Sequence, residues 1–191
     1  ATVGNPVPDM TYANGPELGV PALYPNGVGT AVRFDGSKDQ HVAVANHRDI
    51  NDGGVWPRGA LSWEFWFKPE KLPTAGQTIT LYEQGGNTRG VHLYLSGTQD
   101  SDPTEAEIYM LALNRAETIW GGTLNQVGDE GVTAVKGTVK LGSVYHVAFV
   151  MDGDPSGDLE GTLTGYINGR QVGQVSGVHL LYNHSDDIAF A

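Results

Sequence analysis

A short run rich in oxygen-bearing side chains lies between two predicted strands, at 152–158, and reads Asp-Gly-Asp-Pro-Ser-Gly-Asp. Every second position carries an oxygen, at Asp152, Asp154, Ser156 and Asp158, so that alternate residues could face one hard cation. This spacing is similar to the first half of a calcium-binding loop, although the glutamate at the twelfth position of such a loop is absent. A solvated hairpin loop built from good turn formers is the alternative. We therefore expect either a calcium site or a polar turn here.

Aromatic residues beside turns form a second group that could bind a ligand. An exposed ring stacks on the apolar face of a sugar, and neighbouring amide and acid groups bind its hydroxyls. Trp120 precedes a Gly-Gly pair, Trp56 lies in the loop 51–59, and Tyr182 is followed by Asn183. We expect these four residues to contact a glycan. For Trp120, packing at a strand end is the alternative.

Charge and composition narrow the possible partners. The 191 residues include 11 Lys and Arg against 22 Asp and Glu, a net charge of −11 that disfavours binding to nucleic acid or to an anionic membrane. The same acidity leaves room for bound cations, with solubility in a salty or extracellular medium as the alternative. The chain has no cysteine, so no disulfide or thiolate metal site is expected. Its start has neither a basic region nor an apolar run, and we interpret the chain as one domain of a longer multidomain protein.

Alternating hydrophobicity and closely spaced turn residues predict an all-β domain. Residues 1–29 are rich in Pro, Gly and Asn and are expected to be an irregular lead-in with one short edge strand, whereas about eleven strands follow in 30–191. In the strand at 60–67, Trp66 lies opposite the apolar face, which indicates a central strand covered on both sides, or else a concave ligand groove. We expect the core position. Asn168-Gly169 predicts a type I′ hairpin.

Four segments in order resemble a known family: AVRFDGSKDQHVAVA, LSWEFWFKPEKL, VKLGSVYHVAFVMDG and GTLTGYINGRQVGQV. They resemble the laminin-G-like, concanavalin-A-like lectin/glucanase superfamily over about residues 30 to 190. The resemblance implies a two-sheet antiparallel jelly-roll sandwich, frequent calcium binding at one rim, and a role in binding glycans or proteins within large secreted or surface proteins. Members usually continue with a further strand that pairs back near the start. We therefore expect either that this chain lacks its final strand or that another segment fills that edge.

Catalysis has little support in the sequence. Retaining glucanases of the superfamily use paired carboxylates on one strand face. Glu105 and Glu107 would share a face, about 7 Å apart, while Glu64 stands alone, and the third acid of the motif is missing. The six histidines show no zinc spacing, and no nucleophile elbow, P-loop or dinucleotide fingerprint occurs. Asp35 is expected to shape a turn rather than bind metal.

The resemblance and the absence of catalytic motifs together lead to one hypothesis and two alternatives. The hypothesis is a non-catalytic, calcium-assisted glycan-binding module of a bacterial adhesin or surface protein, secreted or at the cell surface. A protein-interaction or spacer domain that contacts a cell-surface protein is the first alternative, and a glycan-cleaving enzyme is the second.

Overall fold

The computed structural model describes residues 9–24, 26–47, 60–85, 90–113, 132–153, 161–178, 181 and 187–191. Within these residues the chain forms strands and one short 3₁₀ helix, η1 (Gly36–Lys38). The strands are β1 (Met10–Ala13), β2 (Glu17–Pro21), β3 (Thr30–Arg33), β4 (His41–Val44), β5 (Ala60–Phe67), β6 (Thr78–Gly85), β7 (Gly90–Gly97), β8 (Glu105–Leu113), β9 (Val132–Lys140), β10 (Tyr145–Asp152), β11 (Gly161–Ile167), β12 (Arg170–Val178) and β13 (Ile188–Phe190).

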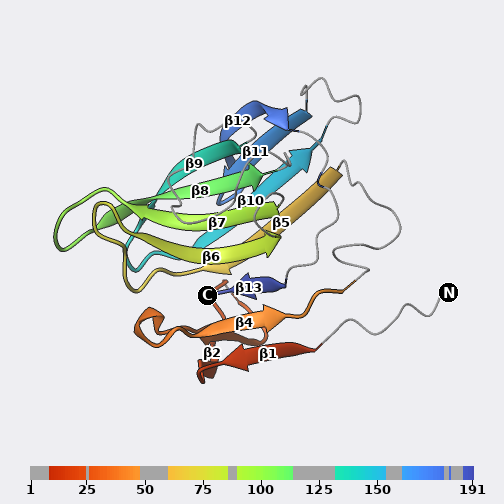
Figure 1. The fold of residues 1–191 in the computed structure, drawn as a ribbon. Helices are drawn as coiled ribbons and strands as arrows, with labels where there is room; N and C mark the ends of the chain where they lie inside the picture. The colour runs from red at the N-terminus through yellow and green to blue at the C-terminus, as the bar shows by residue number, and fades with distance from the viewer. Residues whose placement is uncertain are drawn as a thin grey trace.

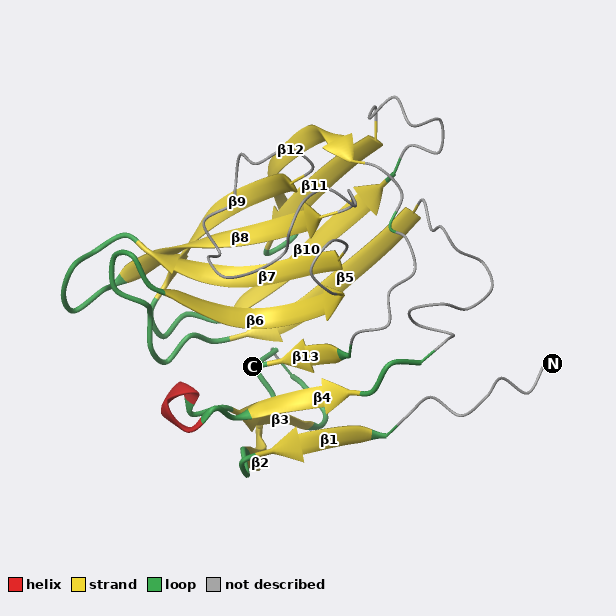
Figure 2. Ribbon diagram, viewed as in Figure 1, coloured by secondary structure: helices red, strands yellow, loops and turns green. Residues whose placement is uncertain are grey.

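The strands build two stacked sheets and a small hairpin. One sheet has seven strands in the order β1-β4-β13-β6-β7-β8-β9, and the other has four in the order β12-β11-β10-β5. Strands β2 and β3 pair with each other. Figure 1 shows β6 to β9 lying across β5, β10 and β11, and Figure 2 shows how little of the described chain is helical. The paired strands run antiparallel within each sheet. Together with the two stacked sheets, this pairing confirms the expected all-β jelly-roll sandwich.

The core lies between the two sheets and is aromatic on the side of the four-stranded sheet. Alternation in β5 turns Trp63 and Phe65 inward, and Phe149 of β10 lies directly opposite Trp63 in the register. The Trp63 and Phe149 rings stack with centroids 4.8 Å apart. Leu93, Leu95, Ile108 and Met110 of β7 and β8 face them from the other sheet. The two-residue period of each strand thus produces one continuous apolar interior.

A buried polar group joins the sheets across this interior. Gln84 of β6 accepts hydrogen bonds through Oε1 from Trp63 Nε1 of β5, at 3.1 Å, and from the Tyr82 hydroxyl, at 2.6 Å. Gln84 and Tyr82 are both buried. Burial raises the pKa of the Tyr82 phenol, so the hydroxyl stays protonated and continues to donate. Two donors that would otherwise be unsatisfied in the core therefore share one amide oxygen.

The β11–β12 hairpin forms where the sequence predicts it. Asn168 and Gly169 have φ of 52° and 75°, as a type I′ turn requires, and Ile167 pairs with Arg170. The turn is also tied to β10, because Asn168 Oδ1 accepts from the backbone N–H of His146 at 2.9 Å. Further along, Gly165 lies against Met110 and Val135 of the opposite sheet, where an added Cβ would come within 2.8 Å of Val135. Glycine at this position lets the sheets approach closely.

The expected position of Trp66 is wrong. Strand β5 is at the edge of the four-stranded sheet, and Trp66 is on its outer side with 46% of its surface exposed. The sequence pattern identified the face correctly but could not show whether a further layer covers it. Val150 of the neighbouring strand β10 lies on the same outer face and is 37% exposed, so this face of the sheet is open to solvent.

The N-terminal segment is more ordered than its composition predicts. Strand β1 pairs with β4 at the end of the seven-stranded sheet, and β2 adds the hairpin with β3, where one edge strand was expected. At the other end of the chain, β13 lies between β4 and β6. Thus β13, the last described strand, pairs with β4, which lies near the start of the chain.

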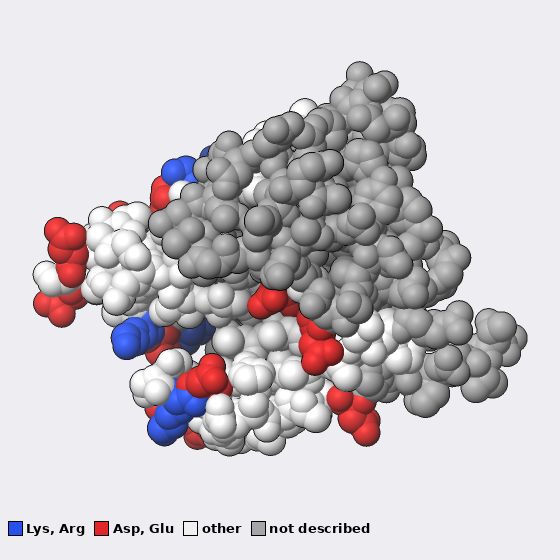
Figure 3. All heavy atoms as spheres, in the orientation of Figure 1, with Lys and Arg blue, Asp and Glu red and all other residues white. Residues whose placement is uncertain are grey.

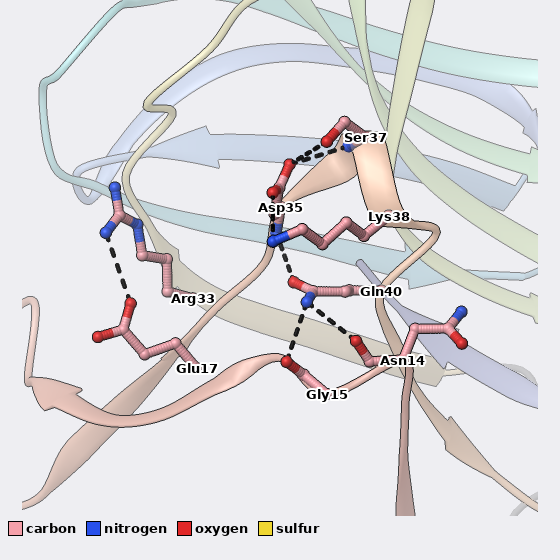
Figure 4. Close-up of polar contacts among 8 residues, drawn as sticks. All are labelled: Asn14, Gly15, Glu17, Arg33, Asp35, Ser37, Lys38 and Gln40. Atoms are coloured by element: carbon pink, nitrogen blue, oxygen red, sulfur yellow. Dashed lines mark hydrogen bonds and ion pairs between the residues drawn. The ribbon is translucent and has the colours of Figure 1, made fainter.

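A polar network fixes the turn between β3 and β4, as Figure 4 shows. The buried Gln40 side chain donates to the carbonyl oxygens of Asn14 and Gly15 and accepts from the Asp35 N–H. Asp35 in turn accepts from Ser37 through both the backbone N–H and the hydroxyl, and these bonds, with Lys38, lower the Asp35 pKa to about 2. Asp35 caps η1, in agreement with the expected turn role.

Candidate functional site

Of the eight site residues predicted from the sequence, the described residues include one, Asp152. Asp152 ends β10 and is exposed. The other metal candidates, Asp154, Ser156 and Asp158, and the aromatic candidates, Trp56, Trp120, Tyr182 and Asn183, lie outside the described residues. In the part of the chain that is described, no three His, Asp or Glu side chains lie close enough together to hold a metal ion.

A different group of polar and aromatic residues comes together on the seven-stranded sheet, on the side facing away from the core. Leu93 and Leu95 of β7 point into the core, so the alternating residues His92 and Tyr94 point away from it. The antiparallel register then sets Tyr94 directly opposite Tyr109 of β8. We call the whole set the tyrosine stripe, and it comprises Thr80, His92, Tyr94, Glu107, Tyr109 and Lys136.

The aromatic members of the tyrosine stripe are in contact across the strands. The rings of Tyr94 and Tyr109 stack almost parallel, at 8° and a centroid distance of 5.1 Å. The His92 ring also packs against Tyr94, with centroids 5.0 Å apart, and its Nε2 lies 3.1 Å from the Thr80 hydroxyl. Cross-strand aromatic pairs of this kind stabilise a sheet and hold their rings in fixed positions. These contacts hold the aromatic part of the stripe in place from β6 to β8.

An ion pair ends the stripe on the side of β9. Lys136 Nζ lies 2.6 Å from Glu107 Oε1, and the Tyr109 hydroxyl donates to Glu107 Oε2 at 2.8 Å. The Lys136 ammonium also lies 5.7 Å from the centre of the Tyr109 ring. The hydrogen bond from Lys136 lowers the pKa of Glu107 and raises that of Lys136, so the pair stays charged. Lys136 is 57% exposed and Glu107 30% exposed, which leaves both open to solvent.

The other end of the stripe is buried although it faces away from the core. His92 and Tyr94 expose 3% and 2% of their surfaces, and Tyr94 joins Leu111 in a second apolar cluster. Desolvation lowers the pKa of His92 to about 4 and raises that of Tyr94 to about 12. Both side chains are thus neutral at pH 7. The stripe passes from a dry, uncharged end at His92 to a charged, accessible end at Lys136.

The sequence interpretation missed most of this group. Glu107 was considered only with Glu105 as a carboxylate pair, and His92 only as one of six histidines without zinc spacing. Alternation in Gly90–Gly97 and Glu105–Leu113 does reveal which residues share a face. The register between β8 and β9, which brings Lys136 to Tyr109, cannot be derived from that alternation.

The described acidic side chains on the visible face of the molecule are spread over several separate patches, as Figure 3 shows. In the described part of the chain, no helix is long and apolar enough to span a membrane.

Solved structures with a similar fold include a receptor binding domain and an enzyme. The structure described as HCR/D-Sa-GBL1/C is 12% identical over 95% of this chain, with a TM-score of 0.58. The botulinum neurotoxin type G receptor binding domain is 11% identical over 93%, with a TM-score of 0.56. The endo-β-1,4-glucuronan lyase of the fungus Trichoderma reesei is 13% identical over 98%, with a TM-score of 0.53. This chain covers 38% of each of the first two structures and 79% of the lyase.

The family itself is shown by a sequence match. No curated protein matches the chain. The family described as the concanavalin A-like lectin/glucanases superfamily matches residues 35–190, which is most of the sequence and agrees with the observed sandwich. The chain therefore belongs to the concanavalin A-like lectin/glucanases superfamily.

Proposed function

We propose that this chain is a non-catalytic recognition module that binds a glycan outside the cell, as part of a larger bacterial adhesin or surface protein. The observation that carries the proposal is the accessible end of the tyrosine stripe, where a fixed tyrosine ring adjoins an exposed ion pair. The receptor-binding role that the name of the botulinum neighbour states is in line with a binding module.

The chemistry of this end suits a sugar ring. Tyr109 is half-buried and held by its stack on Tyr94, so it offers a surface that needs no ordering on binding. Glu107 accepts hydrogen bonds from hydroxyl groups and Lys136 donates to them. Glycan sites combine an aromatic surface with a few fixed polar groups, and these three residues supply both.

The charge state of Glu107 argues against its use as a catalytic acid. A glycosidase needs one carboxylic acid with a raised pKa to protonate the leaving oxygen. Lys136 and Tyr109 instead lower the pKa of Glu107. A carboxylate held in this way accepts hydrogen bonds but has no proton to give at neutral pH.

Calcium remains part of the proposal through the loop that begins at Asp152. Asp152 is exposed at the end of β10, and Asp154, Ser156 and Asp158 follow at alternate positions in the sequence. Four oxygen ligands in one loop would satisfy part of the calcium shell and order the rim of the sandwich.

Cleavage of an acidic glycan is the second candidate function, because one neighbour is a glucuronan lyase and the stripe carries His92, Tyr94 and Glu107 on one sheet face. The two functions are separated by incubating the protein with glucuronan and β-glucan. We expect no turnover; cleavage lost in Glu107→Gln would establish the enzyme instead.

A glycan array tests the proposal directly. We expect binding to a restricted set of glycans, and we expect a calcium chelator to abolish it. A rise in melting temperature with calcium, but no glycan bound under any condition, would favour the protein-interaction or spacer role.

A further inference from the structure

A second exposed aromatic group lies on the opposite side of the sandwich, on the outer face of the four-stranded sheet. Trp66, on the edge strand β5, is 46% exposed, and Tyr24, in the connection between β2 and β3, is 40% exposed. Together with Glu64 and His146 they form what we call the Trp66 platform. Large aromatic rings are enriched where proteins bind one another.

The platform is fixed by contacts from three separate parts of the chain. Trp66 lies opposite His146 in the β5–β10 register, with ring centroids 4.9 Å apart. On the same indole, the Tyr24 ring packs at 5.8 Å and is tilted by 50°. The Tyr24 hydroxyl donates to the Val28 carbonyl at 2.7 Å, and Gly27 N–H donates to the Tyr24 carbonyl, so this ring is held in place. The platform is therefore formed before any partner binds.

A carboxylate adjoins the rings. Glu64 precedes Trp66 by two residues on the same face of β5, a separation of about 7 Å along the strand. Its Oε2 lies 3.5 Å from His146 Nε2, while 77% of the Glu64 side chain remains exposed. An aromatic face next to an accessible carboxylate can hold a cation through two interactions at once: the ring attracts it electrostatically and the carboxylate pairs with it.

We propose that the Trp66 platform binds the guanidinium group of an arginine side chain on a partner protein. Arginine is planar, stacks on indole and pairs with a carboxylate through its fork of N–H groups. The net charge of −11 gives a basic partner a favourable long-range field.

This inference is independent of the glycan proposal because the two groups lie on opposite sides of the sandwich. The tyrosine stripe is on the outer side of β6 to β9, and the Trp66 platform is on the outer side of β5 and β10. A substitution in the Trp66 platform should leave glycan binding unchanged, and the failure of either proposal would not remove the other.

The test is a titration of the chain with acetyl-Gly-Arg-Gly-amide, followed by the NMR signal of the Trp66 indole N–H. The signal is identified by its loss in Trp66→Phe. We expect a saturable shift at millimolar peptide, a weaker effect at high salt, and at least threefold weaker binding in Glu64→Gln. Ser62→Ala, on the same face of β5, should bind as the unchanged chain does.

The matched peptide with citrulline in place of arginine keeps the shape and removes the charge. An equal shift with the citrulline peptide, or no saturable shift with the arginine peptide, would overturn the proposal. Cellotriose serves as the competing ligand: a saturable shift with this sugar and none with the arginine peptide would identify a sugar platform and also overturn it.

Discussion

Gln84 is the residue whose replacement most sharply tests how the two sheets are joined. Methionine has a similar length and shape but no oxygen, so Gln84→Met leaves the Trp63 N–H and the Tyr82 hydroxyl without their shared acceptor. An unsatisfied buried donor costs about 1 to 3 kcal/mol, which applies to the buried Tyr82 hydroxyl, and the part-buried Trp63 N–H adds a smaller cost. Since a whole domain is stable by about 5 to 15 kcal/mol, this is a large fraction. Urea denaturation at pH 7, monitored by tryptophan fluorescence, measures the loss.

A second substitution separates the unsatisfied donors from a simple packing defect. Tyr82→Phe alone removes one hydrogen bond while Gln84 still accepts from Trp63, and should cost about 1 kcal/mol. In the Gln84→Met background, Tyr82→Phe removes a donor that has already lost its partner. The double variant should therefore be more stable than Gln84→Met alone. If the two losses simply add, the hydrogen-bond account of this contact is wrong.

Three further predictions concern packing, pH and ligand contact. Gly165→Ala should lower stability by about 1 to 3 kcal/mol in thermal or urea denaturation, because the new methyl group meets Val135 and Met110. Gly36→Ala, with open space around its Cβ, is the control and should be nearly neutral. The folded pKa of His92, about 4, lies below its ordinary value near 6.5, so the unfolded chain binds the proton more readily. Stability should therefore fall, by up to about 3 kcal/mol, as pH decreases from 6.5 to 4, and His92→Gln should remove this part of the pH profile. Lys136→Met should weaken glycan binding at least tenfold and leave the far-UV circular dichroism unchanged, since Lys136 is 57% exposed; unchanged affinity would exclude this residue from the site.

The elements whose geometry is set by neighbouring residues could be predicted from the sequence. Asn168-Gly169 specifies its turn because few other residues adopt two successive positive φ angles. The alternation in β5 and β10 likewise identifies the inward-facing Trp63 and Phe149. Such patterns depend on the local backbone alone, and the structure follows them.

Features that depend on which strands are neighbours could not be predicted. Trp66 was expected in the core because its strand is apolar on one face and aromatic on the other, but the outer face of its sheet is open to solvent at both Trp66 and Val150. The tyrosine stripe combines Tyr94, Tyr109 and Lys136 through the pairing of β7, β8 and β9. Pairing register over such distances in the sequence is fixed by the whole sheet. Calcium binding by the loop that follows Asp152 stays a prediction.

We propose above all that the accessible end of the tyrosine stripe binds a glycan. The most direct test is calorimetric titration of the best glycan-array ligand into two proteins, the unchanged chain and Lys136→Met. We predict saturable binding to the unchanged chain and at least tenfold weaker binding to Lys136→Met. Equal affinity for both proteins, or the absence of any glycan that binds with or without calcium, would contradict the claim.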